Sequence, residues 1–308
     1  MNTIALCIPA YNAEIYLPQL LESAHRQSLP FDEILVYDDC STDDTGHIAA
    51  KFGVTLIRGD YNRGCSFAKN ALAQMAKSDW LHFHDADDDL LPNFTEVAHK
   101  WINLQHTPDI ILLNFEYRLF SNFELLGKPN YNRSSLKEDH VKFVISNKIM
   151  NFAICNKSKF LEIGGFDTHP AVLYNEDRAF YSRAIANQLT FDYEEIVTCI
   201  NFRYENSMSV SNVEKCAKAH YEVSLFLIEH FGKSYPIEIA ECLWENATIS
   251  ASLQNWELTN RQINSAKSLG SKFPKGQSIL FNALCLLNSK FAFFIREKLI
   301  RILKPQLR

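Results

Sequence analysis

The first hundred residues alternate short apolar runs with helix-like segments, and this alternation restricts the fold more than any other feature. Residues 3–9 read TIALCIP and residues 80–84 read WLHFH, so each run is short and apolar enough for a buried strand. Residues 12–28 and 63–78 carry apolar side chains at helical spacing, and Asn12 is a candidate N-cap for the first of these helices. Strands that alternate with helices form βαβ units. The sequence therefore predicts an α/β fold with a mostly parallel, Rossmann-like sheet flanked by helices.

The last hundred residues follow a different pattern. From about Val213 onward the chain reads as successive amphipathic helices, and no strand-like run comparable to the earlier ones occurs. At 308 residues the chain also exceeds the usual size of one domain. We therefore expect an α/β domain at residues 1–208 and an all-helical region at residues 209–308.

Charge argues against one class of partner and leaves another open. The formal net charge of −5 argues against a general nucleic-acid binder. Residues 290–308 are an exception, because they carry six Lys/Arg and one Glu among many apolar residues. A helix docked on the protein body and a helix in peripheral contact with an anionic membrane would both look like this, so both interpretations stay open.

Cysteine usage and apolar runs indicate the compartment. The eight cysteines include no CxxC pair and no tight cluster, which disulfide scaffolds and zinc ribbons would need. The N-terminus lacks the pattern of a signal peptide, and no run of about 18 uninterrupted apolar residues occurs. We expect reduced thiols, no membrane-spanning segment, and a location in the cytoplasm or on the inner face of the cell membrane.

Polar or aromatic side chains follow three of the predicted strands at the point where each strand ends. They are Pro9, Ala10, Tyr11 and Asn12 after the first strand, Asp38 and Asp39 after the second, and Asp85, Ala86 and Asp87 after the run at residues 80–84. In an open parallel sheet, ligands bind in the crevice outside the carboxyl ends of the strands. The sequence therefore predicts one site at this edge.

The residue types at this edge suit a nucleotide diphosphate bridged by a metal. Asp85 and Asp87 form a D-x-D pair, whose carboxylates suit a hard divalent cation that shares its other positions with phosphates. Asp39 can accept hydrogen bonds from a base or ribose, and Tyr11 offers a flat face to a ring. Donors that can reach a diphosphate follow in the next loop and helix, at Asn62, Arg63, Gly64 and Lys69. The chain lacks GxxxxGK[ST] and a well-placed GxGxxG, which argues against a P-loop NTPase and a dinucleotide oxidoreductase.

Five segments in this order resemble a known family. They read IPAYNAEIYLPQLLESAHRQ, EILVYDDCSTDDT, NRGCSFAKN, HDADDDLLP and GGFDTHPAVLYNEDRAFYSRA. Over about residues 1–205 the set resembles the inverting family 2 glycosyltransferases, which have the GT-A fold. The resemblance implies a nucleotide-sugar donor, most often with uridine, and a glycan or lipid-linked acceptor in bacterial cell-surface polysaccharide synthesis. It also implies that Tyr11 and Asp39 contact the nucleotide and that Asp85 and Asp87 hold Mn²⁺ or Mg²⁺. Asp177 would be the catalytic base, with Glu176 beside it.

The chain departs from the family pattern at several positions. Cys40 stands where many members have Gly, and Ala68, Lys69 and Asn70 stand where many have ARN. Lys69 keeps the charge of arginine but loses its bidentate fork. A histidine that some members place after the last core strand is absent from residues 201–212, so the resemblance assigns no third metal ligand.

Simpler structural interpretations of the same residues remain open. The DADDD run also fits a solvated turn or helix N-terminus, and Asp88 and Asp89 fit a supporting or capping role. His82 and His84 fit either hydrogen-bonded core residues or a zinc site, and residues 175–177 can simply start a helix. Two other functions also remain. They are a sugar nucleotidyltransferase, although the Gly-rich basic loop expected after the first strand is missing, and a catalytically silent nucleotide-sugar-binding or scaffold module.

Overall fold

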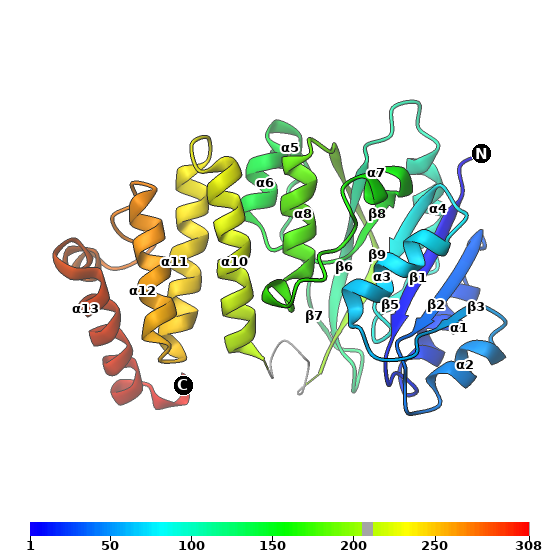
Figure 1. The fold of residues 1–308 in the computed structure, drawn as a ribbon, viewed down its shortest axis with the longest axis horizontal. Coiled ribbons are helices and arrows are strands. Elements are labelled where there is room, and N and C mark those ends of the chain that lie inside the picture. Colours follow the sequence, from blue (N-terminus) through cyan, green and yellow to red (C-terminus); the bar gives the residue numbers. More distant parts are fainter. Residues whose placement is uncertain (205–211, 308) are drawn as a thin grey trace. The chain divides into compact units, whose positions relative to one another are not determined.

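The structure is a computed structural model that describes residues 1–204 and 212–307 (Figure 1). The chain forms two compact units, and each is described by itself. The first contains Met1–His140, Ile149–Thr168 and Arg183–Ser207, and the second contains Val141–Lys148, His169–Ser182 and Met208–Arg308. The expected boundary between residues 208 and 209 lies outside the described residues.

A nine-stranded mixed sheet forms the centre of the first unit. Its strands are β1 (Ile4–Ala10), β2 (Glu33–Asp38), β3 (Thr55–Arg58), β4 (Trp80–Phe83), β5 (Asp89–Leu90), β6 (Ile110–Leu119), β7 (Leu125–Gly127), β8 (Ala153–Asn156) and β9 (Phe191–Arg203). The order is β3-β2-β1-β4-β8-β6-β9-β5, and β7 pairs with β6. The half from β3 to β4 is parallel, as the alternating pattern predicts. Strand β8 runs antiparallel to both of its neighbours, and β9 runs parallel to β6.

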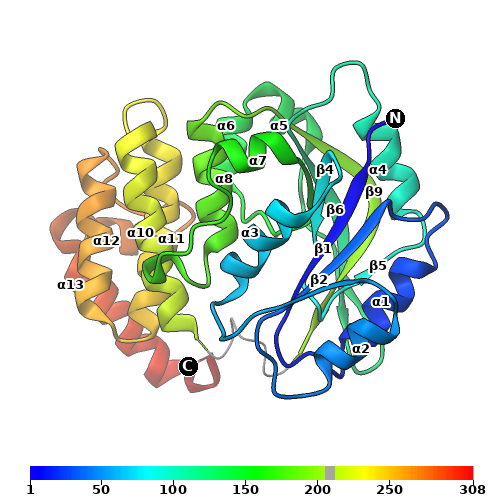
Figure 2. The same cartoon turned by 45° about the vertical axis from the view of Figure 1, so that its right-hand side comes forward.

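Helices cover both faces of this sheet. They are α1 (Leu17–His25), α2 (Thr45–Lys51), α3 (Cys65–Met75), α4 (Phe94–Ile102), α5 (Arg133–Glu138) and α7 (Lys157–Glu162). Figures 1 and 2 show α3 on one face and α1, α2 and α4 on the other. Side chains of β1 on the second face, Ile4, Leu6 and Ile8, are buried in one core cluster with residues of α1 and α4. Burial of such apolar area is the main source of stability in a fold of this kind.

Pairing of β1 with both neighbours brings three strand ends to the same edge. Ala10 pairs with Asp38 of β2, and Cys7 pairs with Phe83 of β4. The residues that follow these pairs are the ones for which the sequence predicts a ligand-binding site. Register therefore brings the predicted groups of the first unit together.

Helix α1 begins later than the sequence predicts. Its N-cap is Tyr16 and Pro18 lies in its first turn, a position that suits proline because the missing N–H would have no partner there. Asn12, the predicted N-cap, has a φ of 48° and lies outside the helix. Its side-chain oxygen instead accepts a hydrogen bond from the backbone N–H of Thr42 at 2.9 Å. The prediction of Asn12 as a cap is therefore wrong.

The second unit is helical. It contains most of α6 (His140–Ser146), the short helix η1 (Pro170–Val172) and the first part of α8 (Glu176–Ala186). Four helices follow, α10 (Val213–Phe231), α11 (Pro236–Ser252), α12 (Trp256–Ser268) and α13 (Ile279–Leu303), and then the short helix η2 (Pro305–Leu307). Described residues from 212 to 307 include no strand, so the predicted succession of helices from Val213 is confirmed.

Helix α13 bears on the expectation that no segment spans a membrane. It is long and apolar enough to cross one by length and composition, although polar residues interrupt its apolar run. The same test is passed by core helices of soluble proteins, so this is weak evidence.

Candidate active site

Asp39 joins the end of β2 to the loop before α3. Its carboxylate accepts hydrogen bonds from the backbone N–H groups of Arg63, at 2.9 Å, and of Gly64, at 2.7 Å. Gly64 is the N-cap of α3 and has a φ of 87°, a backbone conformation that glycine adopts without strain. The guanidinium of Arg63 lies over the rings of Tyr61 and Phe67, at 4.3 and 4.4 Å. The predicted residues Asp39, Asn62 and Gly64 therefore belong to one connected region of the first unit.

Asp38 is fully buried and supports the neighbouring backbone. Its Oδ1 accepts a hydrogen bond from the N–H of Ser41 at 2.8 Å, and its Oδ2 lies 3.3 Å from Nε of Arg58. A Cβ atom at Gly46 would lie only 2.7 Å from Oδ2, so α2 approaches this carboxylate closely. These contacts give Asp38 a structural role in the present geometry.

The end of β1 supplies one exposed ring. Pro9 and Ala10 are buried, and the carbonyl of Ala10 accepts a hydrogen bond from the N–H of Asp39 at 2.8 Å. The side chain of Tyr11 is 50% exposed, which leaves a face free for a ligand ring. Asn12 is tied to the turn after β2, because its own N–H donates to Oγ of Ser41 at 3.0 Å.

Lys69 and Asp85 form an ion pair between α3 and the end of β4. The lysine is only 2% exposed, and its Nζ lies 3.0 Å from Oδ1 of Asp85. Nζ also lies 5.2 Å from the ring centroid of Phe166. The sequence suggested a phosphate contact for Lys69, and the structure shows that its ammonium contacts the first aspartate of the D-x-D pair.

The acidic turn after β4 contains two carboxylates with raised pKa values. Partial desolvation and the charge of Asp85 raise the pKa of Asp87 to about 6. Burial, together with the charges of Asp87 and Asp85, raises the pKa of Asp88 well above its usual range. Such repulsion among acids favours a bound cation, and Asp85 and Asp87 offer the oxygen ligands that Mn²⁺ and Mg²⁺ prefer.

Asp88 fastens this turn to β9. Its carboxylate accepts bonds from Nδ2 of Asn201, at 2.8 Å, and from the N–H of Phe202, at 2.9 Å. The hydroxyl of Tyr204 donates to the carbonyl of Asp87. Asp89 accepts a bond from Nε2 of Gln19 at 3.0 Å. Asp88 and Asp89 thus have the supporting contacts that were one of the expectations for them.

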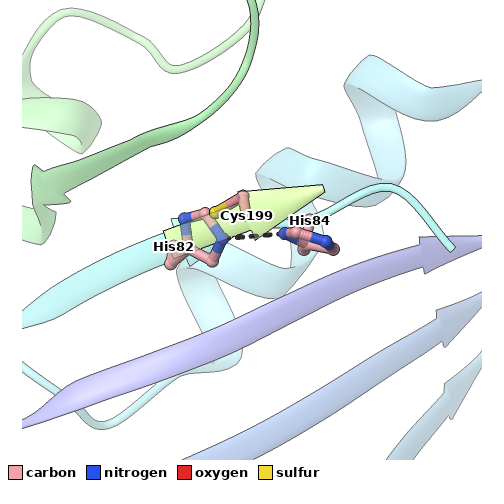
Figure 3. A group of neighbouring side chains, drawn as sticks. All are labelled: His82, His84 and Cys199. Carbon is pink, nitrogen blue, oxygen red and sulfur yellow. Dashed lines mark hydrogen bonds between the residues drawn. The ribbon is translucent and has the colours of Figure 1, made fainter. Parts of the chain in front are cut away.

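His82 and His84 lie in the core beside Cys199 (Figure 3). Nδ1 of His82 is 2.9 Å from the carbonyl oxygen of Ala153, and Nε2 of His82 is 2.9 Å from Nδ1 of His84. Burial lowers the pKa of both imidazoles, that of His82 to about 4. One candidate ligand atom from each of the three side chains lies within 4.8 Å of the others. The histidines are hydrogen-bonded core residues here, and a metal bound by both of these nitrogens would have to replace the bond between them.

Glu176 and Asp177 lie in the second unit, in the first turn of α8. Acids are favoured there by the helix dipole, so the expectation that residues 175–177 start a helix is confirmed. Asn175 donates to the carbonyl of Cys216 at 2.9 Å, and Arg178 donates to that of Ile145 at 3.1 Å. Oε2 of Glu176 is buried without a hydrogen-bond partner among the described residues. These bonds to neighbouring carbonyls anchor the start of α8 within its unit.

One clamp beside the site is absent from the sequence-based prediction. Asn70 of α3 donates to the carbonyl of Phe166 and accepts from its N–H, both at 2.8 Å. Gly165 has a φ of 64°, and a Cβ atom there would collide with Oδ1 of Asn70. The partners are 96 residues apart, so no local pattern predicts the clamp.

Solved structures with a similar fold bind nucleotide sugars. Residues 1–349 of TarS from S. aureus, in complex with UDP-GlcNAc, match with a TM-score of 0.71 and 17% identity, over 97% of this chain and 91% of that chain. Mannosyltransferase PcManGT from Pyrobaculum calidifontis, in complex with GDP-Man and Mn²⁺, matches with a TM-score of 0.56 and 13% identity, over 96% and 87%. At these identities the similarity establishes the GT-A fold alone.

Sequence relatives and a family model identify the enzyme class. An uncharacterized glycosyltransferase of Haemophilus influenzae is 27% identical over 96% of this chain and 99% of its own length. The Escherichia coli protein WfaP, named as a UDP-Glc:alpha-D-GlcNAc-diphosphoundecaprenol beta-1,3-glucosyltransferase, is 28% identical over 41% of this chain and 51% of its own length. The model of glycosyl transferase family 2 matches residues 5–164, just over half of the chain, and the protein therefore belongs to that family.

Proposed function

We propose that the protein is a metal-dependent, inverting hexosyltransferase that uses a UDP-sugar. Its acceptor would be a hydroxyl group of a glycan or lipid-linked sugar in cell-surface polysaccharide synthesis. The observation that carries this proposal is the shared edge of β1, β2 and β4, where Tyr11, Asp39, Asp85 and Asp87 follow adjacent strand ends. The name of the E. coli relative and the ligand in the TarS complex support the donor class, and the former also supports a lipid-linked acceptor.

Residues of the first unit would bind the donor. The exposed ring of Tyr11 is available to lie against the base, and the carboxylate of Asp39 can accept a bond from a base N–H or ribose hydroxyl. Because Asp39 already accepts two backbone N–H bonds, its orientation is fixed before a ligand arrives. The exposed Asn62 and the backbone of Gly64 would face the phosphates.

Asp85 and Asp87 would hold the divalent cation. The raised pKa of Asp87 reflects in part the charge of Asp85, and a cation between them would relieve that repulsion. Bound Mn²⁺ or Mg²⁺ would supply positive charge to the diphosphate leaving group. Lys69 would keep Asp85 oriented through its ion pair.

Asp177 would act as the general base. The acceptor hydroxyl would attack the anomeric carbon from the side opposite the diphosphate, so the bond to the diphosphate breaks and the configuration inverts. The carboxylate of Asp177 would take the proton of the attacking hydroxyl. The assignment rests on the motif around residues 175–181, and Glu176 is the neighbouring acid. The enzyme would act in the cytoplasm or at the inner face of the cell membrane, with peripheral contact through residues 290–308. This location would suit a lipid-linked acceptor.

The test of the proposed function is transfer by the purified protein. Asp177→Asn keeps the size of the side chain and removes the base, so kcat should fall roughly 10²- to 10⁴-fold while UDP-sugar binding persists. Glu214→Gln is a matched control, because Glu214 is an exposed acid in the first turn of α10. Full transfer by Asp177→Asn would overturn the assignment of the base. UDP binding by the wild type without transfer or donor hydrolysis, over a broad acceptor panel, would instead support a silent binding module.

A further inference from the structure

Helix α13 consists of two helical segments joined at Asn288. This residue has φ −156° and ψ 100°, which is extended backbone. Ser278 caps the first segment by accepting a bond from the N–H of Phe281 at 3.2 Å. Asn288 accepts one from the N–H of Phe291 at 3.1 Å and so caps the second segment. Each segment therefore has its own local start signal.

One side of α13 is packed inside the second unit. Phe293 is buried and stacks on Trp244 of α11, with ring centroids 5.9 Å apart. Glu297 is also buried, and its Oε1 lies 3.0 Å from Nε of Arg301. Arg301 further donates to the carbonyl of Ser252 at 2.6 Å. These contacts hold the helix on α11 and fix which side faces outward.

The opposite side is apolar and exposed. We name as the outer face of α13 the large apolar residues Ile279, Leu280, Leu286, Leu287, Phe291, Phe294, Leu299, Ile302 and Leu303. Leu287 is 85% exposed and Ile302 is 73% exposed. Soluble monomeric proteins rarely expose so many large apolar side chains on one element, so we infer that these side chains contact another surface.

Charge indicates what covers the outer face. Lys290 and Lys298 of α13 and Lys304 at its C-cap are exposed, and the segment 290–308 has a local net charge of +5. Its one acid, Glu297, is buried and paired with Arg301. A symmetric contact with a second copy would bring two such positive segments together. An anionic lipid surface offers negative headgroups for the lysines and an apolar interior for the leucines and phenylalanines.

The structure of α13 also indicates its orientation at a bilayer. The break at Asn288 divides α13 into segments of 9 and 15 residues, residues 279–287 and 289–303, which are about 14 and about 22 Å long. Neither segment alone would cross a hydrocarbon core of about 30 Å. A spanning helix would expose every side to lipid, but Phe293 stacks on Trp244 of α11 and Arg301 donates to Ser252, the last residue of α11. The geometry therefore favours a helix that lies flat in the interface.

We propose that the outer face of α13 binds the surface of an anionic bilayer, with the lysines on lipid phosphates and the apolar side chains in the acyl boundary. The inference rests on the proposed function in one respect, namely that membrane binding would bring the enzyme to a lipid-linked acceptor. Binding itself requires no catalysis. It also requires no unfolding, because the residues involved are already exposed.

The test is flotation of the full chain with vesicles. The protein should float with vesicles of phosphatidylglycerol and phosphatidylcholine, less with phosphatidylcholine alone, and less at high salt. Lys290→Gln and Lys298→Gln should each weaken binding roughly fivefold, and Leu287→Ser with Phe291→Ser should abolish it. Ile237→Ser is a control, because Ile237 is an exposed apolar residue of α11 and is not one of the residues of the outer face.

Two outcomes would overturn the proposal. One is an absence of flotation with phosphatidylglycerol vesicles. The other is a dimer, measured by light scattering, that Leu287→Ser with Phe291→Ser dissociates, which would assign the face to a second copy. The Asp177→Asn variant should float as the wild type does. Failure of the proposed catalysis and failure of membrane binding are therefore separate results.

Discussion

The Nζ atom of Lys69 lies 3.0 Å from Oδ1 of Asp85, so the first aspartate of the D-x-D pair has a buried cationic partner. The same ammonium also lowers the pKa of the second aspartate, Asp87, but desolvation and the charge of Asp85 outweigh this effect. The two carboxylates therefore have different surroundings although they are two residues apart. One is paired within the protein, and the other has a raised pKa.

Removal of this cation should destabilise the metal-free protein. Lys69→Met keeps the chain length but leaves Asp85 beside Asp87 without a partner, at an expected cost of about 1–3 kcal/mol in the free energy of unfolding. Urea denaturation in chelator measures the loss, and added Mn²⁺ should recover part of it. Lys159→Met, which breaks the exposed pair with Glu162, should change stability by less than about 1 kcal/mol. Equal stabilities of wild type and Lys69→Met would show that the pair contributes nothing.

Donor binding should depend on the metal through Asp87. Without a cation the diphosphate would face Asp85 and Asp87, so calorimetric titration should show strong UDP binding with Mn²⁺ and weak binding in chelator. Asp87→Ala should remove most of this difference. Asp89→Asn should keep it, because Asp89 is bonded to Gln19. Undiminished affinity in chelator, together with full turnover, would exclude a required metal at these aspartates.

Loss of the bond between Asn201 and Asp88 should affect both stability and the site. Asn201→Ala leaves a buried carboxylate short of a donor, and we expect a loss of about 1–3 kcal/mol. The turn that carries Asp87 should also be less ordered, so the metal dependence of UDP binding should weaken. Asn122→Ala, an exposed change, serves as the control. A normal melting temperature with normal UDP affinity would contradict this role of Asp88.

Acid should destabilise the fold through His82. Burial lowers its folded-state pKa to about 4, below the value of about 6.5 in an unfolded chain. Between these values the unfolded chain binds the proton and the folded protein does not. Stability therefore falls as the pH drops from about 6.5 to about 4, by up to ~1.4 kcal/mol per pH unit.

The measurement is the pH dependence of the unfolding free energy. His82→Gln can still donate to the carbonyl of Ala153 but cannot titrate, so its slope between pH 6.5 and 4 should be smaller by about one proton. The comparison uses the slope of the unfolding free energy against pH and not the absolute stability of the variant. Identical slopes in both proteins would mean that His82 is not the group responsible.

Local patterns sufficed for the parallel half of the sheet and for the position of the acidic turn. The run that became β1 is apolar along its whole length, the run that became β4 is apolar except for His82, and the acidic turn follows β4 directly. The backbone at Cys40 also explains why many family members have Gly at this position, because its φ of 64° lies in the left-handed region where glycine is unstrained. Groups at adjacent strand ends were therefore predictable from the sequence.

Contacts between distant segments were not predictable. The position of β8 between β4 and β6 depends on pairing of Trp80 with Asn156, which no periodicity encodes. The clamp between Asn70 and Phe166 and the pairing of Lys69 with Asp85 likewise depend on tertiary packing. The prediction of Asn12 as a helix cap is wrong for the same reason. Its hydrogen-bond partner Thr42 lies in the turn after β2, 30 residues along the chain. The role of Asp177 stays a prediction from the motif.

The partners of Asp88 determine when the acidic turn can be completed during synthesis. Asn201 and Phe202 follow it by 113 and 114 residues. At about 5–20 residues per second, a ribosome needs roughly 6–23 s to make the intervening chain. During that interval the nascent turn has its acids but not the strand that anchors them. Residues that we assign to the cation are thus made early and fixed in place only after β9 has left the exit tunnel.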